Sequence, residues 1–96
     1  PSFRSASIQK DKVLVSFDNV GKGLEARGGP LSGFAIAAAD KKFVNASATI
    51  VGQRVEVSSP QVPAPAYVRF GWADYPVVNL WNKDGLPAIP FRTDAD

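Results

Sequence analysis

The side chains that carry chemistry are few in this sequence, and the missing types exclude most catalytic sites. The 96 residues contain no Cys and no His. The chain therefore has no thiolate nucleophile, no Cys-based zinc site and no imidazole to act as a general base or metal ligand. Serines are plentiful, but a serine nucleophile needs a base within hydrogen-bond reach and a third group that orients that base. We predict that this chain is not itself an enzyme and holds no metal or cofactor.

Carboxylate pairs are the remaining candidates for acid and base chemistry, of the kind used in glycoside hydrolysis. The candidate pairs, both near the C-terminal end of the sequence, are Asp74 with Asp84 and Asp94 with Asp96. The first pair lies across a turn, and the second lies in a tail that we expect to be frayed. We interpret all four as solvated surface groups.

A glycine-rich segment, Gly21–Ala26, matches the G-x-G-x-x-A spacing of dinucleotide-binding loops and follows a predicted strand. In that motif the loop must open a helix whose N-terminus binds the pyrophosphate. The next residues, 27–30, read Arg-Gly-Gly-Pro and would end a helix within one turn. We interpret this segment as a connection between elements rather than a cofactor site.

Aromatic side chains gather in the last third of the chain beside polar ones. They are Trp72, Tyr75 and Trp81, flanked by Asp74, Asn79 and Asn82. Tryptophan in a small domain packs in the core or at an interface between domains, because each ring buries a large area. Rings beside polar groups are also typical of ligand sites. The sequence leaves both interpretations open.

The charges are scattered, which argues against two classes of partner. Eleven Lys and Arg face nine Asp and Glu, a net charge of +2, and the cations alternate with acids instead of forming one basic face. No apolar run approaches the roughly 18–20 residues of a membrane span, and no leader begins the chain. We predict neither nucleic-acid binding nor membrane binding.

The elements that must position these side chains are strands, because apolar and polar residues alternate with a period of two. The predicted strands are 5–9, 12–17, 34–38, 45–50, 54–58, 67–72 and 79–81. The first two are expected to form a hairpin, and Gly52-Gln53 a tight turn in which glycine has a positive φ. In 67–72 we expect Val68, Phe70 and Trp72 on one side of the strand.

Two stretches do not alternate, and the fold class follows from the whole pattern. The glycines of Asp18–Gly33 predict a long loop, and the prolines after Trp72 confine the tail to a sheet edge or an extended surface strip. A chain of this length forms one domain. We predict an all-β fold in which residues 1–96 form a single antiparallel β-sandwich of about seven strands, immunoglobulin-like, with a jelly roll as the alternative.

Residue patterns in both halves of the chain are shared with a known family. They are VSFDNVGKGL at 15–24, LSGFAIA at 31–37, ADKKFV at 39–44 and, more specifically, VRFGWAD at 68–74, NLWN at 79–82 and GLPAIPFRTD at 85–94. Together they resemble the C-terminal domain of sialate O-acetylesterases. Ala38 and Ile89 depart from that pattern, where the family often has glycine and serine.

The resemblance implies a parent enzyme that removes O-acetyl groups from sialic acid in the periplasm or outside the cell. In that family a serine–histidine hydrolase domain of the SGNH type precedes this region, and no position here matches its catalytic motifs. The chain would then be the non-catalytic C-terminal fragment of a longer esterase. Its partner would be the hydrolase domain of the same chain.

The proline-rich strip Leu86–Phe91, with Trp81 and Phe91 as its anchors, is expected to lie against that hydrolase domain. Trp72, Tyr75 and Arg92 are further candidate contacts to the hydrolase domain or to a glycan. One alternative function is a free-standing sugar-binding module. Another is a partner-binding sandwich of immunoglobulin type, which is disfavoured because proline and charge blunt the edge strands.

Overall fold

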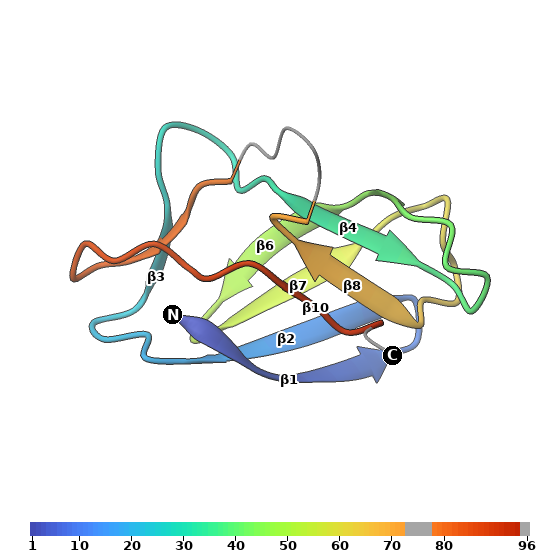
Figure 1. The fold of residues 1–96 in the computed structure, drawn as a ribbon, viewed down its shortest axis with the longest axis horizontal. Coiled ribbons are helices and arrows are strands. Elements are labelled where there is room, and N and C mark those ends of the chain that lie inside the picture. The colour runs from blue at the N-terminus through green and yellow to red at the C-terminus, as the bar shows by residue number, and fades with distance from the viewer. Residues whose placement is uncertain (73–77, 95–96) are drawn as a thin grey trace.

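The chain folds into two four-stranded antiparallel β-sheets packed face to face, with a two-stranded sheet beside them (Figure 1). The structure is a computed structural model that describes residues 1–72 and 78–94. Every regular element in these ranges is a strand, which confirms the predicted all-β sandwich. None of the described residues belongs to a long apolar helix of the kind that crosses a membrane. The immunoglobulin-like topology stays a prediction.

Ten strands are present in the described residues, where the sequence predicts about seven. They are β1 (Ser2–Gln9), β2 (Lys12–Asp18), β3 (Leu24–Ala26), β4 (Phe34–Ala37), β5 (Val44–Asn45), β6 (Ser47–Val51), β7 (Arg54–Ser58), β8 (Tyr67–Phe70), β9 (Leu80–Asn82) and β10 (Phe91–Arg92). One large sheet has the order β1-β2-β7-β6, the other β10-β8-β4-β5, and the small sheet pairs β3 with β9. The additional strands are short: β3 and β10 pair with segments distant in the sequence, and β5 pairs with the neighbouring β4.

The core lies between the inner faces of the two large sheets. Val15 on β2 and Val55 on β7 are fully buried, as are Ile36 on β4 and Phe70 on β8. Each of these side chains stabilises the fold by about 1.5–3 kcal/mol through burial of apolar surface. The alternation that predicts the strands therefore also identifies the faces that pack together.

Two predicted turns are confirmed by the register of the strands. Gln9 pairs with Lys12 in the β1–β2 hairpin, and Val51 pairs with Arg54 across Gly52-Gln53. Gly52 has a φ of 64°, the positive value expected of it.

The prediction that Trp72 continues the inward face of its strand is wrong. β8 ends at Phe70, and Gly71 has a φ of 67°, so the backbone leaves the extended conformation at that point. Val68 and Phe70 are buried as predicted, but Trp72 is 50% exposed. The alternation fails here because one glycine changes the direction of the chain.

The predicted long loop Asp18–Gly33 contains a strand. Within it, β3 pairs with β9, and the register places Leu24 opposite Asn82 and Ala26 opposite Leu80. Residues 24–26 therefore belong to a strand and do not open a helix. This pairing joins segments that are more than fifty residues apart in sequence, and local sequence patterns carry no signal for it.

Candidate functional site

The five predicted contact residues, Trp72, Tyr75, Trp81, Phe91 and Arg92, lie in different surroundings. Trp72 and Arg92 are brought together at the end of β8: the Arg92 guanidinium carbon lies 5.1 Å from the centre of the Trp72 ring. Trp72 is half-exposed and Arg92 is exposed. Tyr75 lies outside the described residues, as do Asp74 and Asp96.

Trp81 lies on the small sheet and already has a cationic partner. It pairs across the strands with Glu25, and the guanidinium carbon of Arg27 lies 4.4 Å from the centre of its ring. Arg27 Nε also donates a 2.6 Å hydrogen bond to Glu25 Oε2. A guanidinium over an indole face is favourable by about 0.5–1 kcal/mol at a partly exposed site. Arg27 therefore covers one face of the Trp81 ring and removes that face from contact with a ligand or a neighbouring domain.

Phe91 lies in the core of this chain and is only 8% exposed. Its ring is 4.7 Å from Phe3, 5.8 Å from Phe17, 6.1 Å from Phe70 and 6.4 Å from Phe34, measured between ring centres. The side chains that the strip 86–91 offers to its surroundings are instead Leu86, 59% exposed, and Ile89, 60% exposed.

Asn82 binds the backbone of neighbouring loops and is 2% exposed. Its Nδ2 donates to the carbonyl oxygen of Asn19 at 3.1 Å, and its Oδ1 accepts from the backbone N–H of Asp84 at 3.1 Å and of Leu86 at 2.9 Å. These bonds hold the turn after β9 against the loop that follows β2. Asn82 is therefore a structural residue rather than a sugar ligand.

Asn79 binds a loop in the same way. Its Oδ1 accepts from the backbone N–H of Ser32 at 2.8 Å, and its Nδ2 donates to the carbonyl oxygen of Pro30 at 2.8 Å. The glycine-rich loop before β4 is thus held to the segment that leads into β9. Neither asparagine beside the tryptophans is directed at a ligand.

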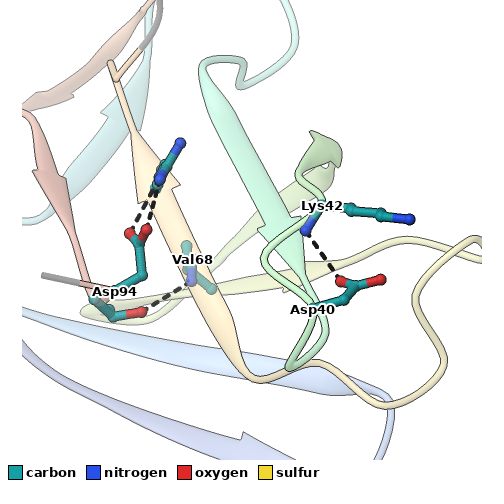
Figure 2. Close-up of polar contacts among 6 residues, drawn as sticks. Asp40, Lys42, Val68 and Asp94 are labelled. Carbon is teal, nitrogen blue, oxygen red and sulfur yellow. Dashed lines mark hydrogen bonds and ion pairs between the residues drawn. The ribbon is translucent and has the colours of Figure 1, made fainter. Parts of the chain in front are cut away.

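Asp94 forms a buried ion pair, so the prediction that it lies in a frayed and solvated tail is wrong. It is 6% exposed, and its Oδ1 and Oδ2 accept hydrogen bonds from Nε and Nη2 of Arg69 at 3.1 and 2.5 Å. Figure 2 shows Asp94 beside Val68 on β8. The backbone N–H of Val68 donates to Thr93 Oγ1, and the N–H of Thr93 donates to the carbonyl oxygen of Val68, both at 3.0 Å. The tail therefore continues the pairing of β10 with β8.

The pKa of Asp94 lies below its usual value, because the hydrogen bonds from the Arg69 guanidinium favour the carboxylate. Arg69 in turn lies over the ring of Phe43, with its guanidinium carbon 3.8 Å from the ring centre. Asp94 is thus held ionised by a fixed partner. A general acid or base needs a carboxyl group whose proton can be exchanged with a substrate, so this arrangement favours a structural role.

Asp84 holds the glycine loop that resembles a dinucleotide-binding motif. Its Oδ2 accepts a 3.2 Å hydrogen bond from the backbone N–H of Lys22. At Gly21, which has a φ of 56°, a Cβ atom would lie 1.7 Å from the same oxygen. This close approach explains the glycine at position 21.

Within residues 1–72 and 78–94, no group of three or more Asp or Glu side chains could hold a metal ion. The described carboxylates occur instead beside cations or at turns. Asp40 Oδ1, for example, accepts a 3.0 Å hydrogen bond from the backbone N–H of Lys42 (Figure 2).

No protein-family model and no curated protein matches this chain. Among solved structures, the chain is similar to a novel carbohydrate acetylesterase from Xanthomonas citri, with 47% sequence identity and a TM-score of 0.93. The similarity covers 100% of this chain but only 23% of the chain of that enzyme. The chain is therefore similar along its whole length to one small part of a carbohydrate acetylesterase.

Proposed function

We propose that this chain is a non-catalytic C-terminal accessory domain of a carbohydrate acetylesterase. The observation that carries the proposal is the similarity to a carbohydrate acetylesterase over the whole of this chain, at 47% identity and a TM-score of 0.93. Because the match takes up 23% of that enzyme, most of the enzyme has no counterpart in these 96 residues. The catalytic groups would belong to that remaining part.

The chemistry of the described side chains supports a non-catalytic role. Ester hydrolysis by a serine enzyme needs a base that activates the nucleophile, and the chain has no His. Within residues 1–72 and 78–94, the one buried carboxylate is that of Asp94, and Arg69 binds it through two hydrogen bonds. Chemistry of that kind is expected in the hydrolase domain instead.

The physical role of such a domain is to present a rigid surface to the catalytic domain. Each exposed Leu or Ile that becomes buried between domains stabilises their arrangement by about 1.5–3 kcal/mol. Without a sizeable apolar interface, domains in one chain move relative to each other. The sandwich would therefore fix the orientation of the hydrolase domain, to which it is joined covalently.

The substrate of the parent enzyme would be an O-acetylated carbohydrate. The resemblance of the stretches at 68–74 and 85–94 to sialate O-acetylesterases favours sialic acid as the acetylated sugar. The similarity to the Xanthomonas enzyme supports carbohydrate acetyl esters as a class. Acetate release from O-acetyl sialosides and from acetylated plant glycans would distinguish these substrates.

Removal of residues 1–96 from the complete enzyme tests the accessory role. The shortened enzyme should keep the catalytic groups but lose thermal stability, with a Tm lower by several degrees. The shortened enzyme should still react with a reagent that labels the active-site serine. Loss of this labelling would show that the deletion removed the nucleophile or its base, and would contradict the proposal.

A second candidate function, glycan contact, is favoured by the pairing of Trp72 with Arg92. Trp72 is 50% exposed, and a half-exposed indole beside a guanidinium offers a ring face and hydrogen-bond donors to a sugar. Titration of the chain with sialosides and plant glycans, followed by tryptophan fluorescence, tests this. Saturable quenching that is lost in Trp72→Ala but kept in Trp81→Phe would support it.

A further inference from the structure

The first residue of the chain lies against its last part. Pro1 is buried, and its carbonyl oxygen accepts a 2.9 Å hydrogen bond from the backbone N–H of Ile89. Figure 1 shows the N-terminus beside the segment that connects β9 to β10. Since consecutive Cα atoms are about 3.8 Å apart, a polypeptide that continues before Pro1 begins within a few ångströms of Ile89.

The segment beside Pro1 is an exposed apolar strip, which we name the Leu86–Pro90 strip. Ile89 and Leu86 are 60% and 59% exposed, the highest values for large hydrophobic side chains in the described residues. Pro87 and Pro90 are exposed as well. No charged residue occurs between positions 86 and 91. Four of the five residues of this uncharged strip are thus exposed and apolar, and an exposed apolar patch is typical of an interaction site.

The strip has a fixed backbone although most of its side chains are exposed. The N–H of Ala88 donates to the carbonyl oxygen of Leu80 at 2.9 Å, and the N–H of Asn82 donates to the carbonyl oxygen of Leu86 at 2.9 Å. Ala88 itself is 8% exposed and belongs to the core. A surface that is already ordered loses little conformational entropy when it docks, which favours association.

The apolar surface continues from the strip towards the end of β8. A Cβ at Gly71 would lie 3.1 Å from Cβ and Cγ of Pro90 and 3.5 Å from Cγ1 of Val78, so Pro90 and Val78 both flank this glycine. Val78 is 41% exposed, and Trp72, the next residue after Gly71, is 50% exposed. These side chains enlarge the apolar surface beyond the strip.

We propose that the Leu86–Pro90 strip is the surface on which the preceding hydrolase domain docks, with Ile89 as the central contact. This inference rests on the proposed function. The connecting polypeptide would join this chain at Pro1, whose carbonyl oxygen is bound by the N–H of Ile89, so the preceding domain would be attached beside the strip. The match to 23% of the related enzyme leaves a much larger segment of chain to cover it.

The chemistry of the strip favours a protein surface over the other possible occupants. A glycan would require polar groups to bind its hydroxyls, and positions 86–91 offer only apolar side chains. A second copy of this chain would compete with a domain held covalently at Pro1, whose effective concentration reaches the millimolar range for a short linker. The covalently attached domain is thus the favoured occupant.

Single cysteines test the docking surface directly, since the 96 residues contain none. Ile89→Cys is compared with Ile8→Cys. Ile8 is 56% exposed and lies near the C-terminal end of β1, whereas Pro1 precedes the first residue of that strand. The rate of maleimide labelling is measured in the 96-residue chain and in the complete enzyme, whose own cysteines are replaced by serine. Leu86→Cys serves as a second reporter if Ile89→Cys does not fold.

We expect Ile89→Cys to react at least tenfold more slowly in the complete enzyme than in the 96-residue chain, and Ile8→Cys to react at the same rate in both. Equal rates for Ile89→Cys in the two forms would overturn the docking surface. Acetylesterase activity of the complete enzyme is measured on the same samples. Its absence would contradict the proposed function, whereas activity without protection at Ile89 would contradict only the docking surface.

Discussion

The ring of Phe3 stacks on the ring of Phe91, with their centres 4.7 Å apart. Phe3 lies on the first strand of one large sheet, and Phe91 lies on the last strand of the other. This contact joins the two sheets at the edge where β1 and β10 meet. It also fixes the end of the Leu86–Pro90 strip relative to the N-terminus of the chain.

Replacement of Phe91 by alanine should destabilise the chain strongly. The buried ring contacts other phenylalanine rings, and truncation of a buried Phe to Ala costs about 3–5 kcal/mol through lost burial and the cavity left behind. Urea denaturation measures the free energy of unfolding. Phe91→Leu, which keeps part of the volume, should cost less, and a loss below about 1 kcal/mol in Phe91→Ala would contradict the placement of this ring in the core.

Replacement of Asp94 by asparagine should change how stability depends on pH. The pKa of Asp94 is lowered in the folded chain by its hydrogen bonds with Arg69, whereas an Asp in an unfolded chain has a pKa of about 3.9. The contribution of Asp94 is therefore fully present above about pH 4–5 and is lost as the pH falls through the lower folded pKa.

The free energy of unfolding, measured from pH 7 to pH 2, should consequently fall more steeply below about pH 4 in the original chain than in Asp94→Asn. Asn45→Ala, which changes an exposed side chain that does not titrate, is the control and should keep the original slope. Identical curves for the original chain and Asp94→Asn would contradict the assigned ion pair.

Replacement of Gly21 by alanine should cost more than the same change at Gly28. Both glycines have a positive φ, 56° and 79°, but an added Cβ meets Asp84 at Gly21 and nothing within 4 Å at Gly28. The conformation itself costs about 1–2 kcal/mol in either variant. Gly21→Ala should add about 1 kcal/mol, because Asp84 must give up its hydrogen bond with Lys22.

Thermal or urea unfolding of the two glycine variants gives the comparison. In an Asp84→Ala background the difference between them should disappear. A difference that persists without the Asp84 carboxylate would show that the close approach is not its cause.

Replacement of Asn82 by alanine should destabilise the turn after β9. The amide makes hydrogen bonds to the backbone of Asn19, Asp84 and Leu86, and its loss leaves part-buried backbone groups without their partner. A cost of about 1–3 kcal/mol is expected for each group that stays unsatisfied. Asn45→Ala, at an exposed position, should change the free energy of unfolding by less than about 0.5 kcal/mol.

Local alternation in the sequence was sufficient to predict the sandwich and much of its core. Val15 on β2 and Val55 on β7 occupy apolar positions of the alternating pattern in the predicted strands 12–17 and 54–58, and both are fully buried. Period-two patterns succeed in β2, β7 and β8 because one face of each of these strands is buried in the core. The same argument fails at Trp72, where the positive φ of Gly71 interrupts the strand.

Pairings between distant segments were beyond the reach of the sequence. β3 with β9 and Arg69 with Asp94 join residues whose neighbours along the chain give no sign of the partner. Phe91 illustrates the same limit, since the prolines at 87 and 90 indicate a surface strip. The ring contacts of Phe91 and the burial of Ala88 show that one side of this segment belongs to the core.

The central claim is that these strands form a scaffold while ester cleavage takes place in another domain. Its most direct test is acetate release from O-acetylated carbohydrates by the purified 96-residue chain and by the complete enzyme at equal molar concentration. We predict hydrolysis by the complete enzyme and a rate equal to the buffer blank for the chain alone. Sustained acetate release by the purified chain would contradict the claim.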